Sequence, residues 1–136
     1  MKLLKITGIL FVATLIFSAV LQVSAGTLTF AGITIAGHGV PHYSSEQKKE
    51  NSSAQSFKLI SAYDFSAMFS QERNIRVKVE NRGTSALSEE KELAKGQSYT
   101  FTANSTKSSG TKYRVQMKTA NILSGSVYLN ATWTYN

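Results

Sequence analysis

The stretch Asn74–Arg82, NIRVKVENR, decides the fold class because apolar and charged residues alternate strictly along it. Its isoleucine and two valines fall on one side of an extended chain, and its charged residues fall on the other. Successive side chains of a β-strand point to opposite faces. The stretch therefore predicts a strand with one buried and one solvated face, as in an antiparallel sheet.

Other stretches repeat or modify this alternation. Thr111–Thr119 and Gly125–Tyr135 repeat it, and the second is the longest, with an aromatic-rich inner side that predicts a central strand. Thr27–Ala36 switches sides at Ala31-Gly32, which predicts a bulge or a crossing between two sheets. Ser56–Tyr63 is apolar on both sides and is expected to be covered on both faces. Six or seven such strands, separated by turn-rich segments, predict an all-β chain with a single antiparallel β-sandwich of Ig-like or jelly-roll type.

The residues expected in the interior share the inward side of these strands. They are Ile75, Val77, Val79, Tyr113, Val115, Val127, Leu129 and Trp133.

Two segments depart from the strand pattern. Leu87–Ala94 is the stretch that favours a short helix, because its apolar residues follow helical spacing among glutamates. Gly37–Ala54, GHGVPHYSSEQKKENSSA, predicts one long polar connection that holds both histidines and the single proline. A connection of this length in a compact domain is usually either functional or mobile.

The N-terminus has the three parts of a secretory signal peptide. Lys2 and Lys5 precede an apolar run from Ile6 to Leu21, and Val23-Ser24-Ala25 forms a small-residue cleavage site before Gly26. The run is too short to favour the alternative, a retained membrane anchor, which needs about 20 residues. We therefore expect residues 1–25 to be removed and residues 26–136 to form the secreted, extracellular domain.

Composition limits the environment and the partners. The chain has no cysteine, so a small exported domain must rely on its core alone, which fits bacterial export, most naturally from a Gram-positive cell. Removing Lys2 and Lys5 from the 15 Lys and Arg leaves 13 against eight Asp and Glu, a net charge of +5. This balance favours an anionic cell-wall polymer or membrane surface, although a merely solubilising surface is the alternative. Nucleic acid is not expected, because no basic run exceeds two residues.

The residue types do not favour catalysis. After the predicted cleavage the chain holds one aspartate, Asp64, and two histidines, His38 and His42, with no nucleophile motif. The histidines are spaced H-x3-H, but the glycines and proline around them exclude a helix that would align them. A weak Cu or Zn site with the Gly26 amine is the alternative to two polar loop residues. We expect no enzyme activity, no metal and no cofactor.

Several short features resemble a group of small, cysteine-free secreted proteins of Gram-positive bacteria that has no established activity. The features are Tyr43-Ser44-Ser45, Lys95-Gly96 before an aromatic strand, and the closing segment from Ser124 to Trp133. The stretch His38–Ala54 is also similar to lactococcin-972-type bacteriocins, which act on the cell envelope, but the further His and Trp residues of that family are missing here. The resemblance implies a secreted β-sandwich and supplies no catalytic residue.

These observations predict a secreted, non-enzymatic protein that binds the cell envelope or extracellular matrix through a basic and aromatic loop surface. A secreted bacteriocin-like or toxin-like antagonist of competing cells is the alternative. Binding is expected on loops held by a rigid scaffold. The candidate binding residues are His38, His42, Tyr43, Lys48, Lys49, Phe65 and Phe69.

Overall fold

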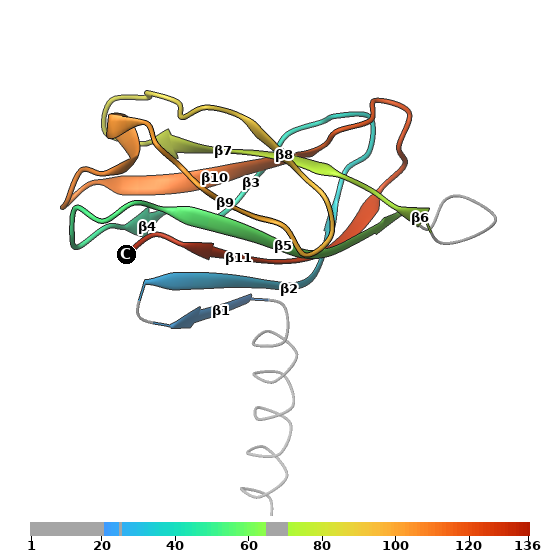
Figure 1. Cartoon of the computed structure of the whole chain (residues 1–136), viewed down its shortest axis with the longest axis horizontal. Helices are drawn as coiled ribbons and strands as arrows, with labels where there is room; N and C mark the ends of the chain where they lie inside the picture. Colours follow the sequence, from blue (N-terminus) through green and yellow to red (C-terminus); the bar gives the residue numbers. More distant parts are fainter. Residues whose placement is uncertain (1–20, 25, 65–70) are drawn as a thin grey trace, which may run out of the picture.

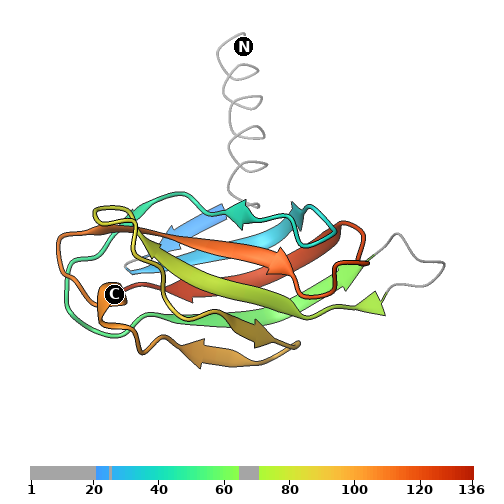
Figure 2. The same ribbon diagram turned by 90° about the horizontal axis from the view of Figure 1, so that it is seen from above.

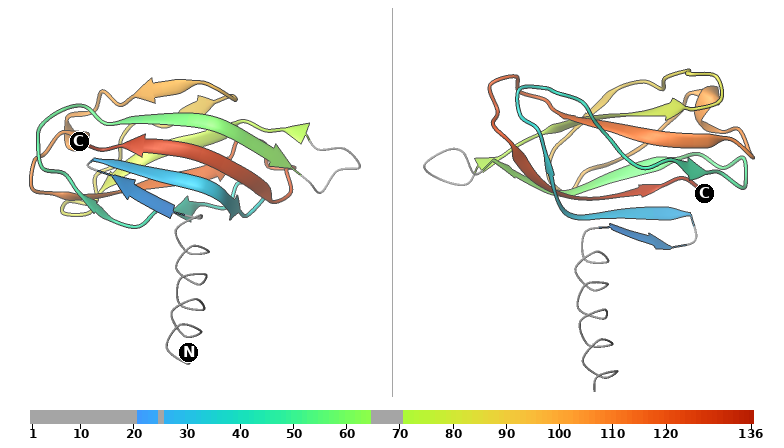
Figure 3. Two further views of the ribbon diagram at one scale, coloured as in Figure 1. Left: turned by 90° about the horizontal axis from the view of Figure 1, so that it is seen from below. Right: turned by 180° about the vertical axis from the view of Figure 1, so that it is seen from behind.

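The computed structural model describes residues 21–24, 26–64 and 71–136, and in them the chain forms two stacked antiparallel sheets (Figure 1). The described part of the chain places six strands in the first sheet, in the order β1-β2-β11-β5-β6, with β9 also pairing with β5. The same part places five strands in the second sheet, in the order β3-β10-β7-β8, with β4 also pairing with β10. Figure 3 shows the first sheet from below and the two layers from behind. The predicted β-sandwich is confirmed, with eleven strands in the described residues in place of the six or seven expected.

The strands of the first sheet are β1 (Leu21–Ser24), β2 (Thr27–Ile35), β5 (Ser56–Asp64), β6 (Gln71–Glu72), β9 (Ser98–Thr100) and β11 (Val127–Thr134). Those of the second sheet are β3 (His42–Tyr43), β4 (Gln47–Lys48), β7 (Ile75–Asn81), β8 (Lys91–Leu93) and β10 (Lys112–Thr119). A 3-10 turn, η1 (Asn104–Thr106), precedes β10.

The core lies between the two sheets and is built from the inward side of the alternating strands. All eight residues predicted for the interior are fully buried. β11 is central in the first sheet, between β2 and β5, as its length and aromatic content predicted. Burying large apolar side chains on the inward side is the main favourable contribution to the stability of such a sheet pair.

Two bulges face each other across β11. The pairing of β11 with β2 skips one residue of β2 around Ala31-Gly32, as predicted, and its pairing with β5 skips Ile60. The side-chain amide of Asn130 joins the two bulges: its oxygen accepts from the Gly32 N–H at 2.9 Å, and its nitrogen donates to the Ser61 hydroxyl at 3.0 Å. The bulge in β5 explains the apolar residues on both sides of that strand.

The expectation that Ser56–Tyr63 is covered on both faces is therefore wrong. The extra residue at the bulge reverses the inward side, so that Leu59 and Ala62 both point into the core. Ile60, the extra residue of the bulge, is 44% exposed. A β-bulge has this effect because one added residue shifts the alternation by one position.

The helix expected at Leu87–Ala94 is also absent from the described residues. Leu87 forms an isolated bridge with Glu80, and β8 pairs with β7 at the edge of the second sheet. The Glu89 carboxylate accepts hydrogen bonds from Tyr99 Oη at 3.1 Å and from the Thr102 N–H at 2.5 Å. These contacts fix an extended backbone, since tertiary contacts readily override a weak helix propensity.

The connection Gly37–Ala54 is held more firmly by hydrogen bonds than its polar composition indicated. Its centre forms β3 and β4, which pair with β10 at the edge of the second sheet. Additional backbone bonds join Ser44 N to Val115 O and Lys49 N to Thr111 O, both at 2.9 Å. The segment is therefore held along most of its length.

The predicted signal peptide lies mostly outside the described residues. Within it, β1 is described and pairs with Thr27–Phe30 at the outer edge of β2. Cleavage after Ala25 stays a prediction. No helix within residues 21–24, 26–64 and 71–136 has the length and apolar character needed to cross a membrane.

Candidate functional site

Basic side chains gather on the outer face of the second sheet, which Figure 2 views from above. Along β10 the inward residues are buried, and the outward residues include Lys112, Arg114 and Lys118. The register places Lys112 opposite Lys48 of β4 and Lys118 opposite Arg76 of β7. Like charges that lie directly opposite each other destabilise a sheet. We call this surface the basic face, which comprises Tyr43, Lys48, Arg76, Lys78, Lys112, Arg114 and Lys118.

An aromatic ring lies among these charges. Tyr43 is opposite Gln116 in the register, so it shares the outward side, and its side chain is 43% exposed. The guanidinium carbon of Arg114 lies 3.9 Å from the centre of the Tyr43 ring, which is the geometry of a cation–π contact. Gln116 donates from Nε2 to the Tyr43 hydroxyl at 3.2 Å. Both contacts hold the ring against the sheet.

A carboxylate on the same side of the sheet fixes two arginines. Glu80 accepts from Arg114 Nε at 2.6 Å and from Arg82 Nη1 at 2.9 Å, and Arg82 also reaches Glu46 at 3.0 Å. Burial of the Glu80 carboxyl works to raise its pKa, but the hydrogen bonds and charges of Arg114 and Arg82 outweigh it and lower the pKa. Glu80 therefore stays ionised, and it orients Arg114 over the tyrosine.

The remaining cations of the basic face divide into two groups. Arg76 and Lys118 share one carboxylate, Glu90, at 4.0 and 3.0 Å. Among the described residues no carboxylate pairs with Lys48, Lys78 or Lys112. The uncompensated charge therefore lies along β4, β10 and the middle of β7.

Lys49 does not belong to this surface, and its prediction as an exposed binding residue is wrong. The side chain is fully buried, and its ammonium donates to the Tyr135 carbonyl and, at 3.2 and 3.3 Å, to Asn51 Oδ1 and Ser53 Oγ. Burial lowers the pKa of Lys49. Adjacent residues of an extended chain point to opposite sides, so Lys48 faces solvent while Lys49 turns inward and satisfies the end of β11.

His42 also points away from the basic face. It is opposite Met117 in the register and therefore faces the space between the sheets. There it lines a groove of about 410 Å³ that includes Phe30, Ile33 and the segment from His42 to Ser45. Burial lowers the pKa of His42, which favours the neutral imidazole.

His38 lies at one end of the sandwich, where the segments 36–41 and 120–126 run side by side (Figure 1). Its backbone N–H donates to Ser124 O at 2.8 Å, and its Nδ1 lies 3.0 Å from Ile122 O. Its φ of 61° is in the left-handed region, which a histidine adopts at some cost. A Cβ on Gly37 would lie 2.4 Å from Ser124 O, so only glycine permits this close approach. His38 thus positions the loop between β10 and β11.

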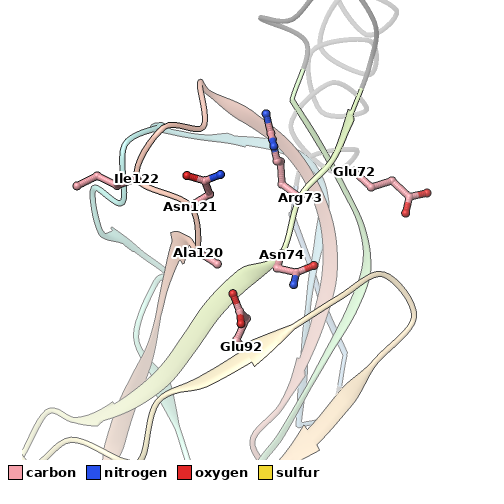
Figure 4. A pocket seen from close by; sticks show the side chains of 7 residues that line it. All are labelled: Glu72, Arg73, Asn74, Glu92, Ala120, Asn121 and Ile122. Carbon is pink, nitrogen blue, oxygen red and sulfur yellow. The ribbon is translucent and has the colours of Figure 1, made fainter.

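A hollow of about 550 Å³ lies at the same end of the molecule (Figure 4). Arg73, Asn121 and Glu92 surround it, while the side chain of Ile122 points away from the others. Arg73 connects the hollow to the buried Asp64 carboxylate, which accepts from Arg73 at 3.3 Å and from the Gly125 N–H at 3.0 Å. These contacts give Asp64 a structural role in holding two loops.

The other predicted site residues are not brought together. Phe65 and Phe69 lie outside the described residues. Within the described ranges, no group of three His, Asp or Glu side chains is arranged to hold a metal ion. Of the seven candidates, Tyr43 and Lys48 lie on the basic face.

Sequence reasoning missed that the basic residues of two distant strands share one surface. Lys78 on β7 and Lys112 and Arg114 on β10 were visible as outward residues of alternating strands. Their common face follows from the pairing of β7 with β10, in which Arg114 lies opposite Glu80. The alternation of residues shows which side of a strand faces inward, but not which strand lies next to it.

Comparison with known proteins gives no family. The sequence matches no protein family, and no curated protein is significantly similar to it. A solved structure with a similar arrangement is a xylanase 10C variant from Cellvibrio japonicus in complex with xylopentaose, with a TM-score of 0.49 and 11% identity. The match covers 84% of this chain and 24% of that chain, so this chain spans about a quarter of the xylanase. A likeness at this level carries no functional inference.

Proposed function

We propose that this is a secreted, non-enzymatic protein that binds an anionic polymer of the cell envelope through the basic face. The observation that supports this most strongly is the pair Lys48 and Lys112, which lie opposite each other without a carboxylate partner among the described residues. Two cations held this close repel each other, and a polyanion lying across them would replace repulsion with attraction.

The neighbouring groups suit a sugar-bearing or polyol phosphate chain. Lys48, Lys78 and Lys112 provide flexible point charges for phosphate groups. Tyr43, held by Arg114, offers an aromatic surface on which a sugar ring can stack. Coulomb attraction would gather the polymer, and stacking would hold it.

The test is binding to purified Gram-positive cell walls, with and without their teichoic acid. The protein should bind intact walls, bind stripped walls weakly, and lose affinity as salt rises past physiological strength, where the screening length is about 8 Å. Lys48→Glu/Lys112→Glu should weaken binding by about tenfold, since each exposed ion pair contributes up to about 1 kcal/mol. Lys58→Glu/Lys107→Glu is the matched control, because it makes the same charge change outside the basic face.

Two results would contradict the proposal. The first is equal binding to walls with and without the anionic polymer. The second is equal loss of affinity in both double variants, which would mean that net charge alone, and not the basic face, governs binding.

A further inference from the structure

The loop between β10 and β11 presents large apolar side chains at one end of the sandwich. Ile122 is 70% exposed and Leu123 is 82% exposed, and Val40 on the neighbouring segment is 49% exposed. Single exposed apolar residues are common on protein surfaces, but two adjacent aliphatic residues at the apex of a loop are an unfavourable arrangement in water. We call Val40, Ile122 and Leu123 the apolar tip.

The backbone around the apolar tip is already hydrogen-bonded within the protein. Leu123 N donates to Asn121 Oδ1 at 2.9 Å, and Ser124 N donates to Asn121 O at 3.0 Å. His38 satisfies the carbonyls of Ile122 and Ser124 through its ring and its N–H. These bonds pair several of the loop's backbone polar groups internally, which lowers the cost of moving the loop from water into an apolar phase.

Cations lie directly behind the apolar tip. A shallow hollow of about 210 Å³ is lined by His38, Gly39, Arg76, Lys118 and Ile122, among other residues. Arg76 and Lys118 lie opposite each other and share the carboxylate of Glu90, so these three groups keep one net positive charge, while Glu92 lies opposite Arg76 on β8. Apolar side chains at the apex with cations one layer behind match the order of acyl chains and anionic headgroups in a bilayer.

From this arrangement we infer that the apolar tip docks on an anionic lipid bilayer. Ile122 and Leu123 enter the boundary between headgroups and acyl chains, and Arg76 and Lys118 bind lipid phosphates. A protein pocket is a poorer match for the apolar tip, because the cations lie behind the tip, in the same order as the headgroup layer behind the acyl chains of a bilayer. The inference goes beyond the proposed function and uses the Arg76 and Lys118 end of the basic face, at the other end of β10 from Lys48 and Lys112.

The experiment is co-sedimentation with vesicles of phosphatidylcholine alone and of phosphatidylcholine mixed with phosphatidylglycerol. The protein should bind the mixed vesicles. Ile122→Ser/Leu123→Ser should weaken this binding by about tenfold or more, which corresponds to about 1.4 kcal/mol, because it removes two aliphatic side chains from the docking contact. Ile60→Ser, which removes an aliphatic side chain 44% exposed on the first sheet, is the matched control and should retain binding within about twofold.

The charge contribution is tested separately. Arg76→Gln/Lys118→Gln should lower affinity for the mixed vesicles more than Lys58→Gln/Lys107→Gln, which removes the same charge elsewhere. Free glycerol phosphate in excess should not release the protein, because the docking depends on the apolar tip as well as on phosphate. All variants carry the same N-terminus, so any contribution of the predicted signal peptide to vesicle binding is the same in each of them.

The outcomes separate the two proposals. Unchanged vesicle binding by Ile122→Ser/Leu123→Ser, or binding to walls but not to vesicles, overturns the inference and leaves the basic face intact. Loss of wall binding with retained vesicle binding in Lys48→Glu/Lys112→Glu would support two separate contacts, one with walls at Lys48 and Lys112 and one with bilayers at the apolar tip. Release by glycerol phosphate alone would show a phosphate site without bilayer docking and would also overturn the inference.

Discussion

The indole Nε1 of Trp133 donates a 2.9 Å hydrogen bond to the side-chain oxygen of Gln55, and both residues are fully buried. The Gln55 amide nitrogen in turn donates to the Thr106 carbonyl at 2.7 Å. The indole is therefore joined through Gln55 to η1, and its polar atom is satisfied inside the core. A buried tryptophan with its N–H paired contributes apolar area without the cost of an orphaned donor.

Truncation of this side chain should be among the most damaging core changes. Trp133→Ala should lower the free energy of unfolding by about 3–5 kcal/mol through the lost contacts and the cavity left behind. Trp133→Phe should cost less, about 1–3 kcal/mol, because it mainly leaves the Gln55 oxygen unpaired. Urea denaturation measures both, with Ile60→Ala as an exposed control expected within about 0.5 kcal/mol of wild type. A stable Trp133→Ala variant would mean that the indole is not in the core.

The adjacent lysines should behave differently from each other. Lys49→Ala should destabilise the fold by about 2–4 kcal/mol, because it removes a long buried side chain and leaves the Tyr135 carbonyl without its donor. Lys48→Ala, its exposed neighbour, should change stability by no more than about 0.5 kcal/mol. Equal effects of the two substitutions in urea denaturation would contradict the burial of Lys49.

The lowered pKa of Lys49 also predicts a pH dependence. The folded chain releases this proton at a lower pH than the unfolded chain, whose lysine keeps its ordinary pKa of 10.5. Between the two pKa values the unfolded state binds more protons, so stability should rise with pH in that window. Lys49→Met should remove this rise, and thermal unfolding at neutral pH and near the ordinary lysine pKa would detect its loss.

Glu80 predicts a second dependence of stability on pH, in the acid range. Its folded-state pKa lies below the ordinary value of 4.5, so the stability it contributes is fully present above that value. This contribution should be lost as pH falls through the folded-state pKa, when the carboxyl protonates and its bonds to Arg82 and Arg114 weaken. Glu80→Gln should be less stable than wild type at neutral pH, and the difference should shrink in acid. An exposed control, Glu50→Gln, should lack this pattern.

The bulge in β2 requires glycine. Gly32 has a φ of +66°, and a Cβ there would lie 2.2 Å from the Tyr128 hydroxyl. Gly32→Ala should therefore cost about 1–2 kcal/mol for the left-handed backbone, together with the displacement of Tyr128. Adding Tyr128→Ala should restore only the stability that is lost through the clash with Tyr128. A double-mutant cycle measures this share. Full recovery in the double variant would mean that the backbone at this position is not strained.

Export supplies a direct test at the N-terminus. Protein recovered from the culture medium should begin Gly26-Thr27-Leu28, and β1 would then be absent. Gly26 is tied to the end of β11, because its carbonyl accepts from Tyr135 N at 2.8 Å. A cell-bound protein that retains residues 1–25 would rule out cleavage at this site.

The sequence by itself determined the features that depend on local alternation. The inward side of β7, β10 and β11, the burial of Trp133 and the bulge at Ala31-Gly32 all follow from which neighbours are apolar. Alternation has a period of two and is read along one strand, so no distant contact is needed to predict it. The all-β sandwich follows because strands with one apolar face must cover that face with another sheet.

Only the tertiary structure decided which strands are neighbours and which way the irregular segments face. Lys48 meets Lys112 because β4 pairs with β10, and Lys49 turns inward because it is one residue further along the chain. His38 and His42, close in sequence, serve an end loop and an inter-sheet groove. The segment at Leu87–Ala94 is extended because Glu89 binds across the chain. Each of these outcomes depends on pairing between distant segments, whose register is fixed by the packed core and leaves no periodic signal in the local sequence.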